Sequence, residues 1–217
     1  MFRSALTVIL GLFVSFNATA LEKVTEGKKG IVIIESESTS SSLKKWKKKT
    51  TVENYSGEGH LEFTGNQPTS GRADSPLKYK FKVDKEGSYS FYIRGYKRLV
   101  DDKGNKARND HCNDCYIRLE GDYESGSEIS KDVLEHDQKF YIHGKSHEQW
   151  DWATTMEYHH PKDKKQKGKK PPVYKLKKGE VYTLVISGRS QRFNMDKIVF
   201  IHESLNQKKE LAEAAGK

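Results

Sequence analysis

The chain has 217 residues, a formal net charge of +9 and a mean hydropathy of −0.86. Only 34% of its residues are hydrophobic, and beyond the N-terminus no apolar run approaches the ~20 residues that a transmembrane helix needs, which argues against a membrane-spanning protein. The length suits a single domain, and the low apolar content favours a β-sandwich, whose strands each bury only one face.

The N-terminal segment, residues 1–20, has the pattern of a signal peptide. Arg3 precedes an apolar run, and the segment ends in Ala18-Thr19-Ala20, a small-x-small sequence that signal peptidase accepts. We therefore expect a secreted or periplasmic protein whose mature chain begins at Leu21.

Alternation of apolar and polar residues dominates residues 21–202 and predicts an all-β domain, a jelly-roll β-sandwich of antiparallel strands. The expected strands span residues 30–37, 59–63, 77–83, 88–96, 115–121, 173–176, 181–187 and 193–201. The turn sequence Asp-Lys-Glu-Gly at residues 84–87 predicts a hairpin between the third and fourth of these strands. Residues 125–172 are expected to contain long loops, and the tail, residues 203–217, is expected to be a short helix or a disordered segment.

The positive charge is concentrated in two segments, KKWKKK at residues 44–49 and KDKKQKGKK at residues 162–170. Their polar and turn-forming neighbours suggest loops. Such lysines either keep the surface solvated or attract an anionic polymer. Nucleic acid is not an expected partner, because the chain is predicted to be secreted and has no recognisable nucleic-acid motif.

Four segments carry a resemblance to a known family. They are IVIIESE (residues 31–37), YSGEGHLEF (55–63), LKYKFKVDKEGSYSFYIRGY (77–96) and LKKGEVYTLVISGRSQRFNMDKIVFI (176–201). In order and spacing, over roughly Gly30 to His202, they resemble the family 6 and family 35 carbohydrate-binding modules, which are β-sandwiches of the galactose-binding-like type. The resemblance implies a carbohydrate ligand.

The resemblance also implies a structural Ca²⁺ ion held by a Glu-x-Glu pair and an Asp of the last strand. The matching positions are Glu35, Glu37 and Asp196. Carboxylate oxygens suit Ca²⁺, and residues i and i+2 of a strand share a face. The alternative is that two exposed strand glutamates and an unrelated aspartate stand at these positions.

The sugar site implied by the resemblance combines an aromatic ring with an amide. Trp150 matches the tryptophan-containing loop of these families and Asn194 matches the Asn before the final strand; Trp152 is either a second ligand contact or part of the core. Aromatic rings stack on the C–H faces of sugars, and an amide both donates to and accepts from hydroxyl groups.

Between Arg94 and Cys115 the chain departs from those families by inserting a long polar loop. Tyr96, Arg98, Asp110 and Asn113 are further candidates for ligand binding there, and a merely solvated loop is the alternative. A competing location for the ligand site is the outer sheet face, where four side chains are expected to point away from the core: Tyr92, Arg94, Tyr116 and Arg118. Arginines beside aromatic rings suit a carboxylated or sulfated glycan.

The two cysteines, Cys112 and Cys115, form a C-x-x-C pair. The pair lacks the further ligands of a zinc site and the βαβ context of a redox enzyme. In an oxidising compartment we expect a local disulfide, with free thiols as the alternative.

Together these patterns predict a secreted, monomeric, non-catalytic module that binds a polysaccharide or oligosaccharide. The lysine segments favour an acidic glycan. One alternative is a polysaccharide lyase on the same scaffold, because the sequences FYIHG and MEYHH hold histidine and tyrosine residues of the kind that abstract a proton beside a carboxylate. A cell-surface adhesion or structural protein is the other.

Overall fold

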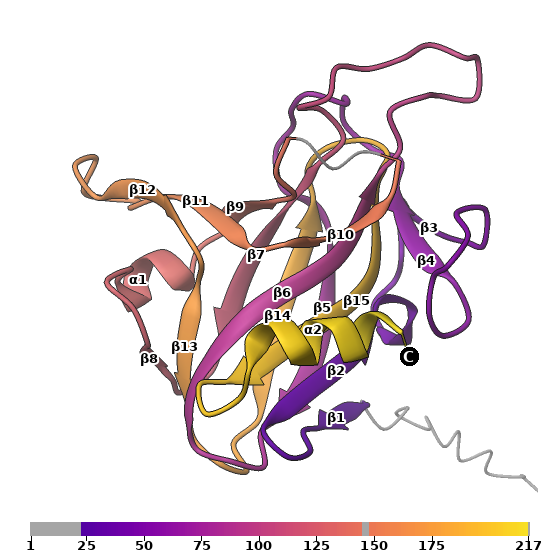
Figure 1. Ribbon diagram of the computed structural model, residues 1–217. Coiled ribbons are helices and arrows are strands. Elements are labelled where there is room, and N and C mark those ends of the chain that lie inside the picture. Colours follow the sequence, from indigo (N-terminus) through magenta and orange to yellow (C-terminus); the bar gives the residue numbers. More distant parts are fainter. Residues whose placement is uncertain (1–22, 145–147, 217) are drawn as a thin grey trace, which may run out of the picture.

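The chain folds into two β-sheets packed face to face, which confirms the predicted β-sandwich (Figure 1). The computed structural model describes residues 23–144 and 148–216. The predicted signal peptide, residues 1–20, lies outside this described part. All the strand pairs of the described chain run antiparallel except the parallel pair between β1 and β5.

One sheet, which we call sheet A, has its strands in the spatial order β1 (Val24–Glu26), β5 (Asp74–Lys82), β14 (Tyr182–Gly188), β7 (Asp114–Glu120), β9 (Gln138–Tyr141), β11 (Thr155–His159) and β12 (Lys167–Lys170). The other, sheet B, has the order β3 (Trp46–Lys49), β4 (His60–Phe63), β15 (Phe193–His202), β6 (Gly87–Lys97), β13 (Val173–Leu176) and β8 (Glu124–Ser125). In addition, β2 (Ile31–Glu35) pairs with β15, and β10 (Trp150–Ala153) pairs with β6.

The core lies between the two sheets and is rich in aromatic rings. Phe81 of β5 stacks on Phe200 of β15 with ring centroids 4.4 Å apart, and Phe91 of β6 lies 5.0 Å from Phe200. All three rings are buried. Each aromatic pair adds about 0.5–1.5 kcal/mol beyond the area that it buries. The Phe81–Phe200 pair joins the two sheets, whereas the Phe91–Phe200 pair joins neighbouring strands of sheet B.

The predicted hairpin between residues 77–83 and 88–96 is wrong. β5 belongs to sheet A and β6 to sheet B, so the turn at residues 84–87 carries the chain from one sheet to the other. The carboxylate of Asp84 accepts hydrogen bonds from the backbone N–H groups of Lys29, at 2.6 Å, and Gly30, at 3.0 Å. These bonds tie the crossover to the start of β2. Alternation of apolar and polar residues shows which face of a strand is buried, but the buried faces of both sheets look the same in the sequence. The pattern therefore did not distinguish a hairpin within one sheet from a crossover between two.

The two lysine-rich segments are not simply loops, because each contains an edge strand. β3 is the end strand of sheet B and β12 the end strand of sheet A. In β3, Trp46 turns into the core while Lys47 and Lys48 are exposed. Lysines on an edge strand discourage pairing with a second chain, so part of the positive charge has a structural explanation.

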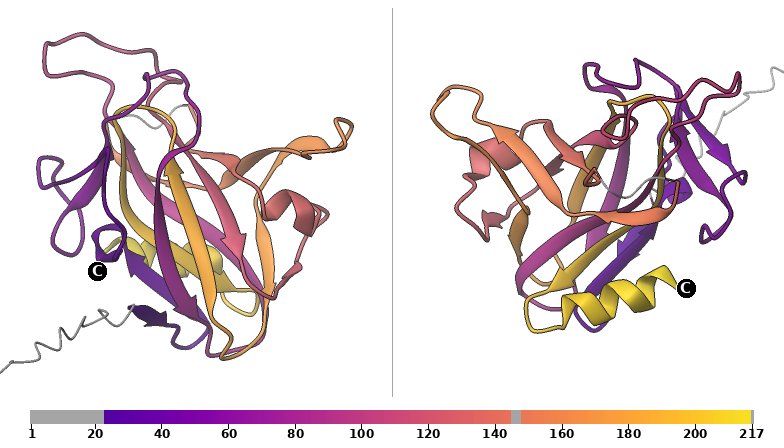
Figure 2. Two further views of the ribbon diagram at one scale, coloured as in Figure 1. Left: turned by 180° about the vertical axis from the view of Figure 1, so that it is seen from behind. Right: turned by 45° about the horizontal axis from the view of Figure 1, so that its top comes forward.

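Residues 125–172, expected to contain long loops, also contain the strands β9 to β11 and the short helix α1 (Lys131–Leu134). The tail forms the helix α2 (Gln207–Ala215), whose first turn is capped by the Asn206 side chain accepting from the N–H of Lys209. α2 lies across the outer face of sheet B, where Leu211 and Ala214 pack in one apolar cluster with Val199 and Ile201 (Figures 1 and 2). Among the described residues, no helix has the length and apolar character to cross a membrane.

Candidate functional site

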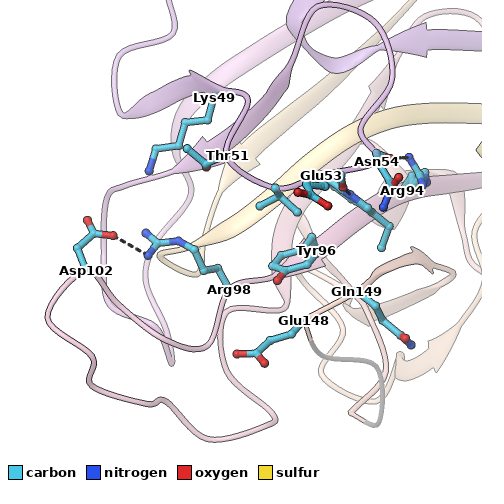
Figure 3. A pocket seen from close by; sticks show the side chains of 12 residues that line it. Lys49, Thr51, Glu53, Asn54, Arg94, Tyr96, Arg98, Asp102, Glu148 and Gln149 are labelled. Carbon is cyan, nitrogen blue, oxygen red and sulfur yellow. Dashed lines mark hydrogen bonds and ion pairs between the residues drawn. The ribbon is translucent and has the colours of Figure 1, made fainter.

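A cavity of about 700 Å³ opens on sheet B where β6 and β10 meet the segment that follows β3. Figure 3 shows Tyr96 between two walls, one formed by the segment from Lys49 to Asn54 and the other by Glu148 and Gln149. We call this the Trp150 pocket. Its volume is within the range of about 300–1,000 Å³ typical of small-molecule sites.

Strand pairing brings the two aromatic residues of the pocket together. Trp150 opens β10 and pairs with Tyr96 of β6, so that their side chains stand next to each other on one face, with ring centroids 5.5 Å apart. The indole Nε1–H donates to the carbonyl oxygen of Glu53 at 2.7 Å, and the buried His60 ring meets the indole edge-on at 5.5 Å. These contacts fix the indole while leaving it partly exposed.

The cations of the pocket are already paired with carboxylates. Arg98 donates to both carboxylate oxygens of Glu62, at 2.6 and 3.0 Å, and to Asp102 at 2.9 Å, while Lys49 donates to Glu62 Oε1 at 2.6 Å. Burial alone would raise the pKa of Glu62, but the hydrogen bonds from Arg98 and Lys49 hold that pKa below its ordinary value. The guanidinium of Arg98 is therefore held in a fixed orientation at the rim.

A β-bulge positions the second arginine. The register between β15 and β6 shifts between Met195 and Lys197, so Asp196 is an extra residue opposite β6. The fully buried Asp196 accepts from Arg94 at 2.7 Å and from the backbone N–H of Ser56 at 2.7 Å. Arg94 also lies 5.3 Å from the Trp150 ring centroid and thus links the bulge to the pocket.

The two predicted calcium-binding glutamates lie close together, but they are not residues i and i+2 of one strand. Glu35 ends β2, whereas Glu37 is in the 3₁₀ helix η1 (Ser36–Ser38). Both side chains surround Gly57, whose φ of +62° and contact with Glu37 Oε1 leave no room for a Cβ atom. Ser56 Oγ donates to Glu35 Oε2 at 2.6 Å, and the N–H of Glu58 donates to Glu37 Oε1 at 2.7 Å.

The donor chemistry here fits a hard cation. Glu37 Oε2 is buried without a hydrogen-bond partner, and burial, reinforced by the charge of Glu35, raises the pKa of Glu37. A cation between Glu35 and Glu37 would satisfy that oxygen and remove the repulsion. Asp196 is instead engaged by Arg94 and Ser56, and within the described residues no three acidic, His or Cys side chains form a ready metal cluster.

Three of the predicted ligand residues do not reach the Trp150 pocket. Asn194 is fully buried in β15, where its amide donates to the carbonyl oxygen of Arg192 at 3.0 Å. Asn113 is buried and donates to the carbonyl oxygen of Ile142 at 3.1 Å. Asp110 is exposed in the inserted loop and pairs with Arg108 at 3.3 Å. Trp150, Tyr96 and Arg98 are the predicted residues that the structure brings together.

The competing surface of four outward-facing residues is not one surface. Tyr92 and Arg94 belong to sheet B, and Tyr116 and Arg118 to sheet A, on the opposite side of the sandwich. The Tyr92 hydroxyl donates to Gln207 of α2 at 2.6 Å, so that residue is covered. Tyr116 lines a smaller cavity of about 400 Å³ on sheet A.

The predicted disulfide is absent, because Cys112 and Cys115 are both free and buried. Cys115 points from β7 into the core, with Sγ 3.9 Å from the carbonyl oxygen of Phe140. Cys112 has φ of 54° and turns its Sγ toward Arg192, at 3.7 Å. The two thiols therefore lie in different surroundings, and burial raises the pKa of each.

Sequence reasoning missed one wall of the pocket, the residues after β3 from Thr51 to Asn54, as well as Gln149. None of them follows a periodic pattern. Trp46 is the residue from which this wall could have been predicted. A tryptophan inside a lysine run indicates a strand with one buried face, and such a strand would have placed the turn that follows it beside β4 and β15.

No protein-family model and no curated protein matches the sequence. Solved structures of similar fold include the GH26-CBM35 β-(1,4)-mannanase of Podospora anserina, with 10% identity over 82% of this chain and a TM-score of 0.47. The match covers 29% of the mannanase chain, so this chain spans less than a third of that enzyme.

Two further similar structures are single modules. A family 35 carbohydrate-binding module of Clostridium thermocellum has 13% identity, a TM-score of 0.45, and coverage of 79% of this chain and 98% of its own. The C-terminal family 6 module of a Zobellia galactanivorans enzyme has 13% identity, a TM-score of 0.42, and the same coverage of 79% and 98%. These likenesses concern the course of the chain; what the Trp150 pocket binds depends on its own side chains.

Proposed function

We propose that this chain binds a polysaccharide non-covalently in the Trp150 pocket. The observation that carries the proposal is the pair of partly exposed rings, Trp150 and Tyr96, set 5.5 Å apart beside a guanidinium that Glu62 holds in place. A sugar ring lies against the aromatic face through its C–H groups, and fixed polar groups around it bind the hydroxyls. Since desolvating the hydroxyls offsets much of each hydrogen bond, the affinity is modest.

An acidic glycan is the proposed ligand class, supported by the net charge of +9 and by the lysine-rich strands β3 and β12. These strands lie on opposite sides of the molecule (Figure 1), and the pocket itself pairs its cations with carboxylates. The positive charge therefore acts through long-range attraction rather than by direct contact, and added salt should weaken binding only in part.

We further propose that Ca²⁺ binds at Glu35 and Glu37, with Asp196 as a third ligand if Arg94 releases it. The support is the orphaned Glu37 Oε2 and the raised pKa of Glu37. When bound, the ion would supply positive charge that fixes the end of β2 against the Ser56–Gly57 turn. Arg94 contacts both Asp196 and the Trp150 ring, so binding of the ion through Asp196 would also change the surroundings of the pocket.

Export from the cytoplasm completes the proposal and is supported by the pattern of residues 1–20. N-terminal sequencing of the protein recovered from the producing cells should begin at Leu21.

Native gel electrophoresis through alginate, polygalacturonate, a sulfated algal glycan and a neutral β-1,4-mannan tests the binding. We expect at least one acidic polysaccharide to retard the wild type and to retard the Trp150→Ala variant much less. The same glycans are incubated with the protein while ultraviolet absorbance is followed. Appearance of an unsaturated product would establish the lyase alternative and overturn the non-catalytic reading.

A further inference from the structure

The Trp150 pocket does not end at Arg98. A second cavity, of about 390 Å³, shares Lys49, Arg98 and Asp102 with it. A third, of about 370 Å³, shares Asp101, Asn105, Gln191 and Arg192 with the second. The three cavities share lining residues and so follow one another from Trp150 to Pro68, and we call this series of cavities the groove.

The inserted loop, residues 99–113, builds the far half of this groove, and it projects from the top of the sandwich in Figure 1. The loop is internally braced. The Asp101 carboxylate accepts from the N–H groups of Lys103 at 2.9 Å and Asn105 at 2.8 Å, and Val100 forms a β-bridge with Lys106. Hydrogen bonds, chiefly from Asn105, lower the pKa of Asp101, so it is an acceptor at neutral pH.

The base of the loop is fastened to the core. Leu99 is fully buried, and the buried Lys97 donates to the carbonyl oxygens of Asn109 at 3.0 Å and His143 at 3.3 Å. Arg192 lies 3.5 Å from the Asp101 carboxylate. A loop fixed before binding loses little conformational entropy when a ligand arrives, which favours its use as a wall of a site.

The two halves of the groove differ in chemistry. Tryptophan and tyrosine rings line only the Trp150 end, whereas the far half presents the His111 imidazole, long cations, and amides and hydroxyls such as those of Gln191, Asn105 and Thr64. Charge is nearly balanced along the whole length. The cations are Lys49, Arg94, Arg98, Lys103, Lys106 and Arg192, and the carboxylates are Glu53, Glu62, Asp101, Asp102 and Glu148.

We propose that the groove takes an internal stretch of a glycan chain, one sugar stacked at Trp150 and the following units running past Arg98 to Gln191. This rests on the proposed function and specifies its ligand: an extended, unbranched chain of several units rather than a chain end or a single sugar. The aromatic end supplies most of the affinity, and each polar contact beyond it adds a smaller increment.

Calorimetric titration with oligomannuronate, oligogalacturonate and manno-oligosaccharides, each as di-, tetra- and hexasaccharide, tests this. We expect the Kd to fall with length, by ~10-fold from disaccharide to hexasaccharide, equivalent to ~1.4 kcal/mol. In the double variant Lys103→Ala/Gln191→Ala the ratio of the two Kd values should collapse toward one. The matched control Lys178→Ala, at an exposed lysine in the turn between β13 and β14, should keep the full ratio.

Equal Kd values for disaccharide and hexasaccharide in the wild type would overturn the extended groove while leaving binding at Trp150 intact. A length-dependent gain that persists in the double variant would overturn the assignment of the far half to residues 99–113 and Gln191. Failure of every oligosaccharide and polysaccharide to bind would instead overturn the proposed function itself.

Discussion

Replacing Trp150 with alanine removes the ring on which we expect a sugar to stack. The substitution also removes the 2.7 Å hydrogen bond to the Glu53 carbonyl and the edge-on contact with His60. That carbonyl lies at the surface, where water replaces the lost donor, so loss of the hydrogen bond lowers the folding stability by only about 1 kcal/mol. The loss in binding should be larger, ~2 kcal/mol for a central aromatic anchor, which is a ~30-fold rise in Kd.

Two variants separate binding from stability. Trp150→Phe keeps a ring in the pocket but loses the indole donor, and should raise the Kd less than Trp150→Ala does. Trp152→Ala is the matched control, because Trp152 lies on the same strand and packs beside Tyr92, with centroids 6.5 Å apart, outside the pocket. Calorimetry against the retarding glycan measures the Kd, and thermal melts measure stability. An unchanged Kd in Trp150→Ala, or an equal loss in Trp152→Ala, would refute the reasoning.

Three further predictions concern the cation, the helix and the thiols. Because the pKa of Glu37 is raised in the folded state, its carboxyl stabilises the fold at acidic pH, and this contribution is lost as the pH rises through that pKa. In EDTA at neutral pH, the Glu37→Gln variant should therefore melt no lower than the wild type. Addition of CaCl₂ should raise the Tm of the wild type but not that of Glu37→Gln. An unchanged wild-type Tm with CaCl₂ would contradict the calcium site. Removing residues 203–217 uncovers Val199 and Ile201, so ANS fluorescence should rise and the Tm fall by several degrees; silence in both would contradict the packing of α2. Cys112 and Cys115 should react with DTNB only after unfolding, and dithiothreitol should leave the Tm unchanged; rapid labelling of the folded protein, or a Tm lowered by reduction, would contradict two buried free thiols.

The strands that carry the core were predictable because burial on one face imposes a period of two. β5, with Leu77, Tyr79 and Phe81 inward, and β13, with its exact bounds Val173–Leu176, follow directly from that pattern. The edge strands β3 and β12 were missed because the lysines that protect an edge conceal the alternation. Which sheet a strand joins is decided by contacts distant in sequence, so the crossover at residues 84–87 could not be predicted.

The candidate site was predictable only in part. Trp150, Tyr96 and Arg98 were chosen from the sequence, and the pairing of β10 with β6 explains why they meet. Asn194 was chosen because it matches the Asn of the resembled families, and Asn113 because it lies in the inserted polar loop, but both amides donate to backbone carbonyls instead. A sequence shows that an amide is present and not whether its partner is a ligand or the chain's own backbone.

The measurement that tests the central claim most directly is an NMR titration of ¹⁵N-labelled protein with the hexasaccharide that binds. Each indole Nε1–H gives its own resonance, and the indole of Trp46 is buried and donates to the Ser75 carbonyl at 2.9 Å. We predict that the Trp150 indole signal shifts in a saturable way while that of Trp46 stays in place. Shifts confined to residues around Tyr116 on sheet A, with Trp150 unmoved, would contradict the site.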